Sequence, residues 1–162
     1  MADDRLDHRA SSSTSGRSKK STPEAEALGR SRGGFSTKLH AAIDALGNPL
    51  GFILTPGQQS DITQAETLIS PYDTDAVVGD KGYDSDKFIA FIKAREAEAV
   101  IPSRKNRKEQ REIDENLYKD RNKVERFFNR IKHYRRIATR YDKTGRNYLS
   151  FVYLASTMVW LL

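Results

Sequence analysis

The sequence predicts a mixed α/β fold, with a sheet flanked by helices. Short apolar runs bounded by turn residues alternate with segments of helical spacing, which is the pattern of strands interleaved with helices. The chain has 162 residues, of which 37% are hydrophobic, and this suffices for one domain with a sizeable core. Cysteine is absent, so disulfides and thiolate zinc sites are excluded and a reducing, cytoplasmic location is expected.

The amino-terminal third predicts a flexible segment followed by a hairpin. Residues 1–34 are rich in Ser, Gly, Arg and Lys with few apolar residues, so we expect this segment to be flexible and the ordered domain to cover 35–162. Large residues alternate with small or polar ones over 35–43, and a Gly-Asn-Pro turn at 47–49 precedes a second apolar run at 50–54. This pattern predicts two antiparallel strands.

The middle of the chain predicts two further strands, each preceded by a helix. Helical spacing of apolar residues favours a helix over 61–69, and Asp84 or Ser85 provides a cap for another helix. The apolar runs 76–78 and 99–102 are short enough for buried strands.

The carboxyl-terminal part predicts two helices. One amphipathic helix is expected over 117–136, and an apolar helix follows over 148–162. The second is interrupted by hydroxyl side chains and is shorter than the ~20 residues that a bilayer span needs, so we expect a buried helix and no membrane partner.

Four polar side chains share one stripe of the 117–136 helix. At about 100° per residue, Tyr118, Arg121, Glu125 and Lys132 lie within a wedge of about 60°. The neighbouring sector is apolar and is expected to pack on the core; it holds Leu117, Val124, Phe127, Phe128, Ile131 and Tyr134. The rest of the helix surface is strongly basic and includes Arg126 and Arg130. The wedge therefore carries one acid, Glu125, with two cations, on a helix whose surface is otherwise strongly basic.

The basic residues are concentrated in one part of the chain. Residues 101–146 contain 16 Lys and Arg against 7 Asp and Glu, whereas the rest of the chain is slightly acidic. Such a distribution is typical of a protein that binds nucleic acid along one face. The alternative is a solvated helix face with no ligand.

Two acids are candidates for metal-assisted chemistry on a phosphate backbone. Asp80 follows the strand 76–78 directly and would lie at its carboxyl end, where open α/β sheets bind ligands. Together with Glu125 it could hold a divalent ion. The alternatives are structural: Asp80 could form a turn with its own backbone, and Glu125 could pair with Arg121.

Several ordered motifs over roughly 29–162 resemble the catalytic half of DDE transposases from bacterial insertion sequences. They are Gly29-Arg-Ser-Arg-Gly-Gly34, Leu54-Thr-Pro-Gly57, Asp80-Lys-Gly-Tyr83, Tyr118-x2-Arg121-x3-Glu125-x6-Lys132, Val124-Glu-Arg-Phe-Phe-Asn-Arg-Ile-Lys132 and Ala138-Thr-Arg-Tyr-Asp-Lys143. The resemblance implies a ribonuclease H-like fold with Asp80 and Glu125 as the second and third acids of a triad.

The same resemblance implies a metal and a DNA partner. The acids would hold Mg²⁺ or Mn²⁺, and Tyr118, Arg121 and Lys132 would lie beside double-stranded DNA of the element ends or target. Arg126 and Arg130 are further candidates for contacts with DNA phosphates. A homo-oligomer is expected for the complete protein, associated with the bacterial nucleoid.

The first central strand of a ribonuclease H-like sheet, which carries the first acid, is not found in the sequence. The only acids before the hairpin are Asp3, Asp4, Asp7, Glu24 and Glu26, and their surroundings lack apolar alternation. Our hypothesis is therefore that the chain is the carboxyl-terminal part of a longer transposase, and whether it is an enzyme by itself stays open.

Three functions are compatible with these residues. The first is an insertion-sequence transposase that cuts and joins DNA at the element ends with a metal. The second is a non-enzymatic DNA-binding or regulatory fragment of a transposase. The third is a ribonuclease H-like nuclease unrelated to mobile elements.

Overall fold

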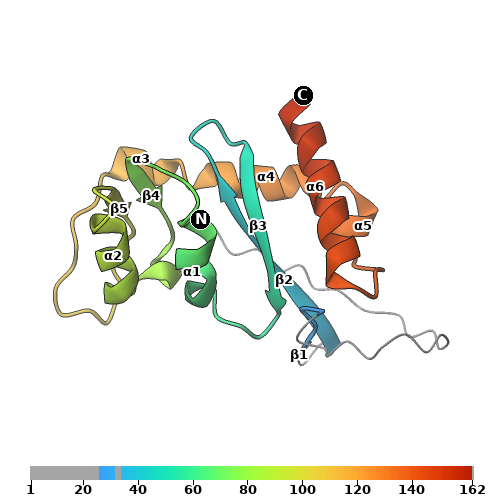
Figure 1. Cartoon of the computed structure of the whole chain (residues 1–162). Helices are drawn as coiled ribbons and strands as arrows, with labels where there is room; N and C mark the ends of the chain where they lie inside the picture. Colours follow the sequence, from blue (N-terminus) through green and yellow to red (C-terminus); the bar gives the residue numbers. More distant parts are fainter. Residues whose placement is uncertain (1–25, 32–33, 162) are drawn as a thin grey trace.

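A computed structural model of the chain describes residues 26–31 and 34–161, which form two small sheets and their covering helices (Figure 1). The strands are β1 (Gly29–Ser31), β2 (Gly34–Ile43), β3 (Pro49–Pro56), β4 (Ala76–Val78) and β5 (Glu98–Val100). The helices are α1 (Ile62–Ile69), η1 (Lys81–Tyr83), α2 (Asp86–Lys93), α3 (Glu115–Lys119), α4 (Asn122–Ile131), α5 (Arg135–Ala138) and α6 (Gly145–Leu161). The predicted α/β class is confirmed.

The hairpin predicted over 35–54 is present as β2 and β3. The two strands are antiparallel, with Leu39 opposite Leu54 in the register. In the turn, the Asp44 carboxylate accepts hydrogen bonds from the backbone N–H groups of Leu46 and Asn48, each at 2.8 Å. Gly47 has a φ of +93°, a conformation that glycine adopts without strain. The turn residues thus set the hairpin as their types predict.

A short strand not expected from the sequence extends this sheet. Strand β1 pairs antiparallel with the start of β2, and the sheet order is β1-β2-β3. It lies within the segment 1–34, most of which falls outside the described residues. Its backbone pairing with β2 needs no apolar side chains, so hydropathy alone did not reveal it.

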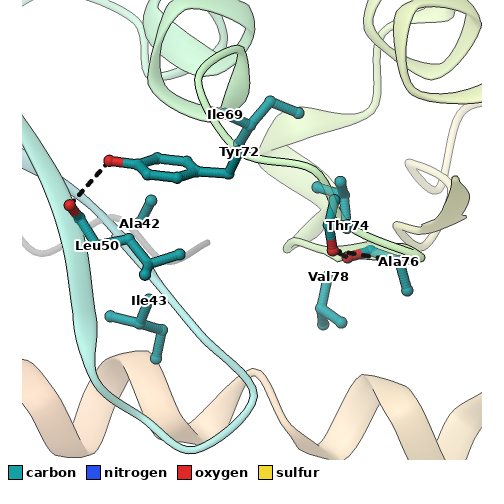
Figure 2. Close-up of a pocket in the computed structure, with 9 residues that line it drawn as sticks. Ala42, Ile43, Leu50, Ile69, Tyr72, Thr74, Ala76 and Val78 are labelled. Atoms are coloured by element: carbon teal, nitrogen blue, oxygen red, sulfur yellow. Dashed lines mark hydrogen bonds between the residues drawn. The ribbon is translucent and has the colours of Figure 1, made fainter. Parts of the chain in front are cut away.

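The expectation of a single mixed sheet needs correction for the described part of the chain. Strands β4 and β5 pair in parallel, but they form a separate two-stranded sheet. A cleft of about 90 Å³ lies between β2 and β4, as Figure 2 shows. One hydrogen bond crosses its edge, because the Tyr72 hydroxyl donates to the Leu50 carbonyl oxygen at 2.8 Å.

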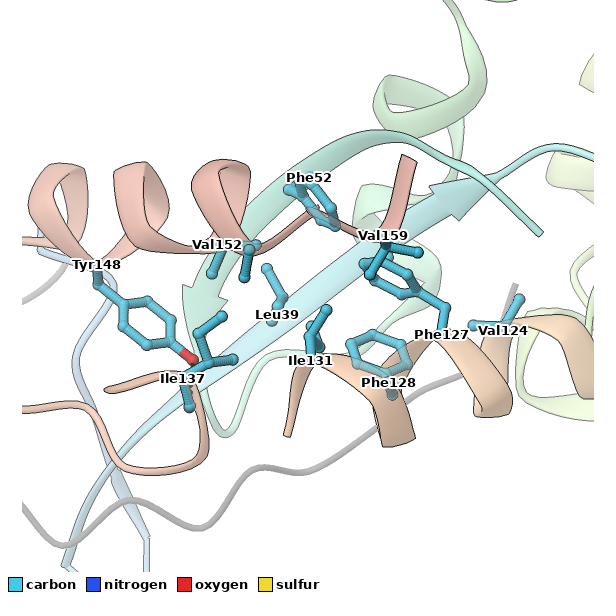
Figure 3. Packing of buried hydrophobic residues seen from close by; sticks show 12 residues of the cluster. Leu39, Phe52, Val124, Phe127, Phe128, Ile131, Ile137, Tyr148, Val152 and Val159 are labelled. Atoms are coloured by element: carbon cyan, nitrogen blue, oxygen red, sulfur yellow. Dashed lines mark hydrogen bonds between the residues drawn. The ribbon is translucent and has the colours of Figure 1, made fainter. Parts of the chain in front are cut away.

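One core lies between the hairpin and the carboxyl-terminal helices. Figure 3 shows α4 and α6 directing apolar side chains at one another and at the hairpin. The buried members include Leu39, Phe52, Val124, Phe127, Phe128, Ile131, Tyr148, Val152 and Val159. The apolar sector predicted for α4 is therefore confirmed from Val124 to Ile131. Two predicted members lie outside this core: Leu117 is only half-buried on α3, and Tyr134 is 42% exposed beyond the end of α4.

A second core lies on the other face of the hairpin, under α1 and α2. It joins both sheets, because it contains Ala42 of β2 and Val77 of β4. The two helices contribute Ala65, Leu68, Ile69, Phe88, Ile89 and Ile92. Successive residues of a strand point to opposite faces, so β2 supplies Leu39 and Ala41 to the first core and Ala42 to the second.

The single helix predicted over 117–136 is divided into α3, α4 and α5. Between α3 and α4 the backbone stays helical, but Asp120 and Arg121 donate to carbonyl oxygens three residues earlier, as in a tight 3₁₀ turn. After α4 the chain turns sharply, and Tyr134 is extended, with φ −78° and ψ 108°. Helical periodicity predicts which face of a segment is buried. It does not predict where a tight turn divides the segment into separate helices.

Helix α6 matches the helix predicted over 148–162 and begins three residues earlier. It packs one face on the hairpin, while Leu154 and Met158 are exposed on the other, so it is only half buried. No helix in the described part of the chain combines the length and apolar character needed to cross a membrane.

Candidate functional site

The candidate acid Asp80 lies at the end of β4 and forms a turn. It precedes the 3₁₀ helix η1 as its N-cap, and its Oδ1 accepts a hydrogen bond from the Gly82 N–H at 2.7 Å. The side chain is partly exposed. Its place at the carboxyl end of a parallel strand agrees with the sequence prediction, and so does the turn-forming alternative. A metal-binding role and a turn-forming role of Asp80 are compatible, because the hydrogen bond from Gly82 uses only one of the two carboxylate oxygens.

The candidate acid Glu125 lies in the first turn of α4 and forms an ion pair. Its Oε1 accepts a hydrogen bond from the Arg121 guanidinium at 2.6 Å, and 47% of its side chain is exposed. The Arg121 guanidinium also lies over the Tyr118 ring, 5.9 Å from its centroid. Three members of the predicted stripe are therefore together, although they belong to two helices.

The cationic candidates lie along α4 and at its end. Arg126 and Arg130 are exposed, four residues apart on the solvent face. Lys132 caps the carboxyl end of α4 and is partly buried. The basic face predicted from the sequence is thus present on this helix.

The structure gives Asp80 and Glu125 separate partners. Asp80 bonds within its own turn, whereas Glu125 bonds to Arg121. Among residues 26–31 and 34–161, no three Asp, Glu or His side chains gather closely enough to hold a metal ion. The two carboxylates have the donor chemistry that Mg²⁺ and Mn²⁺ prefer. Glu26, an early acid within the described residues, accepts a hydrogen bond from the Gly145 N–H at the start of α6.

A buried cluster that the sequence patterns did not reveal surrounds Asp84. Its carboxylate is fully buried and paired with the guanidinium groups of Arg107 and Arg111. Burial by itself raises the pKa of Asp84, but the hydrogen bonds from these arginines outweigh it and lower the pKa to about 2. The charged segment 103–115 could have indicated this cluster. It follows a predicted strand and carries many cations, and cations that become buried need a carboxylate to pair with.

A second unpredicted cluster is buried between β2 and the start of α1. Lys38 Nζ lies 2.7 Å from Asp61 Oδ1, and His40 Nε2 lies 2.8 Å from the Thr55 hydroxyl. Burial lowers the pKa of His40 from 6.5 to about 4; the charge of Lys38 adds to this effect and that of Asp61 opposes it. His40 is therefore neutral at pH 7. The alternation over 35–43 predicted a strand but gave no partners for its polar side chains, and the position of α1 buries them.

Comparisons with known proteins agree on one family. The family model described as "Transposase DDE domain" matches residues 9–161. A protein of Brucella ovis, "Putative transposase for insertion sequence element IS6501", is 44% identical over 129 residues, which cover 78% of this chain and 99% of the relative.

A more distant relative and the solved structures complete the comparison. "Putative transposase for insertion sequence element IS402" of Burkholderia cepacia is 31% identical over 135 residues. These cover 76% of this chain and 62% of that relative. No solved structure matches the chain.

Proposed function

Because the chain belongs to the family of transposase DDE domains, we propose that it acts in the transposition of an insertion sequence by cutting and joining DNA at the element ends. The observation that supports this most is the stripe on α3 and α4. There a partly exposed carboxylate, Glu125, is held by Arg121 on α4, where every other charged residue is a cation. The polyanionic backbone of DNA would be attracted to the solvent face of this helix, and Glu125 would lie within the contact.

The proposed fold is ribonuclease H-like, with a central strand joining the two sheets. The antiparallel hairpin and the parallel pair already share one core under α1 and α2. The cleft between β2 and β4 supports this proposal, because an additional strand between them would complete a single mixed sheet. Such a strand would carry the first acid of the triad.

Asp80 and Glu125 are the proposed metal ligands. A divalent ion held by them would activate the attacking oxygen and stabilise the leaving oxygen of an in-line displacement at phosphorus. The protein's own part is positional. The Gly82 N–H orients the Asp80 carboxylate, and Arg121 holds the Glu125 carboxylate against the helix until the site is loaded.

The proposed DNA contacts come from the same helices. Arg126 and Arg130 would bind phosphates from the solvent face of α4, and Lys132 would add a charge at its end. Tyr118, with Arg121 over its ring, would lie against the DNA end. These contacts position the backbone and carry little sequence information.

Strand cleavage with single acid variants tests this proposal. We expect the chain to bind a labelled duplex of the element end with strong salt dependence and to cut it only weakly, and only with Mg²⁺ or Mn²⁺, because the first acid of the triad is not found in this sequence. Asp80→Asn and Glu125→Gln should remove the cutting while the affinity for DNA stays within a few fold, since neither substitution removes a cation. Cutting that survives both substitutions contradicts the site.

A second candidate is a DNA-binding fragment without catalytic activity. It is favoured by the absence of a three-acid group among the described residues. The same assay separates the two functions, because this fragment binds the duplex with salt dependence and leaves it intact with either metal.

A further inference from the structure

One loop outside the stripe on α3 and α4 is folded around a buried carboxylate. Residues 103–111, here called the Asp84 loop, follow β5 and surround Asp84. The Arg104 backbone N–H donates to Asp84 Oδ2 at 2.7 Å, and Arg107 Nε donates to the same oxygen at 2.7 Å. Arg111 donates to Asp84 Oδ1. Three points of the loop therefore meet on one carboxylate, which is ionised at neutral pH.

The Asp84 loop is also bonded to itself. Gln110 Nε2 donates to the carbonyl oxygens of Arg104 and Arg107, at 3.2 and 3.0 Å. The Arg111 N–H donates to the Ser103 hydroxyl at 2.9 Å. A loop with this many internal bonds loses little conformational entropy when a ligand binds to it.

Arg104 connects the Asp84 loop to the turn that carries Asp80. Its guanidinium donates to the carbonyl oxygens of Lys81 and Gly82, at 3.2 and 3.0 Å. The Gly82 N–H in turn holds the Asp80 carboxylate. The loop is therefore a neighbour of the proposed metal ligand Asp80, to which it is connected by two successive hydrogen bonds through Gly82.

The charges of the loop are divided between its inner and outer sides. Arg107 and Arg111 are neutralised by Asp84, and Arg107 also pairs with Asp86 at 2.7 Å. Lys105 and Lys108 are exposed, and neither forms an ion pair within the part of the chain that the structure describes. The two lysine ammonium groups are thus presented on a preformed surface that also carries the exposed Glu109, while the Arg104 guanidinium is engaged by carbonyl oxygens.

We propose that the Asp84 loop binds the DNA backbone beside Asp80, with Lys105 and Lys108 contacting phosphates and Asp84 positioning the loop. This inference rests on the proposed function, since it takes DNA as the substrate. Lysine ammonium groups bind phosphates as point charges, so the contact adds affinity and alignment without reading sequence. The hydrogen bonds from Arg104 to the turn of Asp80 then place the bound DNA strand next to the proposed metal ligand.

The charge contribution is tested by removing both lysines. DNA affinity of the full chain is measured by fluorescence anisotropy on a labelled duplex at several NaCl concentrations. For Lys105→Ala/Lys108→Ala we expect the slope of log K against log salt to fall by about 2, and the affinity at about 0.1 M salt to drop roughly ten- to hundredfold.

A matched control removes the same charge elsewhere. Lys87 and Lys93 of α2 are also exposed and lie outside the basic segment 101–146, so Lys87→Ala/Lys93→Ala should leave the slope nearly unchanged. Equal effects of the two double variants would show that net charge alone acts, and would overturn the proposal.

The positioning role is tested by Asp84→Asn in the wild-type chain and in the Lys105→Ala/Lys108→Ala chain. In the wild type we expect a loss of affinity close to that of the lysine variant. In the lysine variant we expect little further loss, because the loop has no contacts left to position. Fully additive losses contradict the positioning role. If Asp84→Asn fails to fold, Gln110→Ala replaces it, since that exposed side chain holds the loop from outside the core.

The α4 variant Arg126→Ala/Arg130→Ala separates this inference from the proposed function. If it weakens DNA binding and the lysine variant behaves like its control, only the loop inference is overturned. If the wild-type chain shows no salt-dependent binding of duplex DNA, the proposed function fails with it.

Discussion

At the scale of single residues, the polar side chains of Glu125 and His40 differ in how strongly the fold constrains them. Glu125 pairs with Arg121 near the surface, where such pairs contribute only about 0.3–0.5 kcal/mol to stability. Opening this pair for another ligand therefore costs little. His40 is different, because it is only 2% exposed and its neutral state depends on the fold around it.

His40 should make the stability of the chain sensitive to acid. Its pKa is about 4 in the folded chain and 6.5 as the ordinary value, so the unfolded state binds more protons between these values. The stabilising contribution is complete above pH 6.5 and is lost as the pH falls towards 4. We expect a loss of roughly 3 kcal/mol over this window, measured by urea unfolding at successive pH values.

A variant that cannot titrate provides the control for His40. His40→Gln keeps an amide donor within reach of Thr55 and should flatten the pH dependence between 6.5 and 4. The window of Asp84 lies lower, since its pKa is depressed to about 2 and its contribution is lost only as the pH falls below about 4. An unchanged pH profile in His40→Gln would assign the acid sensitivity to other groups.

At the scale of elements, α4 joins the core to the candidate site. Its apolar side carries Val124, Phe127, Phe128 and Ile131, each at most 3% exposed, and its opposite side carries the candidate residues. The Phe127 ring stacks on Phe52 of β3, with 5.7 Å between the ring centroids, and this contact holds the helix on the hairpin. The orientation of Glu125 thus depends on packing from the other side of the helix.

Phe127→Ala should destabilise the chain by about 3–5 kcal/mol, because it leaves a cavity under α4. Denaturant unfolding followed by circular dichroism measures this change. Arg126→Ala, one residue earlier and exposed, should change the unfolding free energy by no more than about 0.5 kcal/mol. A small effect of Phe127→Ala would mean that α4 is not held by this core.

At the scale of the whole molecule, the hairpin β2–β3 connects two cores that lie on its opposite faces. The first is formed with α4 and α6 and the second with α1 and α2. The Trp160 indole N–H donates to the Pro49 carbonyl oxygen at 3.0 Å, which fixes the end of α6 to the hairpin. Because both cores need the same two strands, we expect them to unfold together.

Ile92→Ala tests this coupling from the core that lacks tryptophan. Ile92 is fully buried under α2, and its truncation should cost about 2–5 kcal/mol. Trp160 is the only tryptophan in the sequence, so its fluorescence reports the α6 end of the hairpin. We expect the fluorescence and circular dichroism transitions of Ile92→Ala to shift by the same amount. A fluorescence transition that stays at its wild-type midpoint would show two independent units.

Local patterns were sufficient to predict most elements and the candidate residues. The hairpin, α1, β4, α2, β5 and α6 lie within a few residues of their predicted bounds, because strand alternation and helical spacing depend on neighbouring residues only. The α/β class and the transposase family were also readable from the motifs. The role of Asp80 and Glu125 as metal ligands stays a prediction.

Only the tertiary structure decided the separation into two sheets, the division of the 117–136 helix and the partners of the buried charges. Strand pairing and burial depend on residues that are distant in the chain, so Asp84 and the cations of the Asp84 loop meet across more than 20 positions. Spacing along the chain predicts which face of an element is apolar. Which charged side chain is buried against which partner is set by packing, and that arrangement prepares the loop beside Asp80.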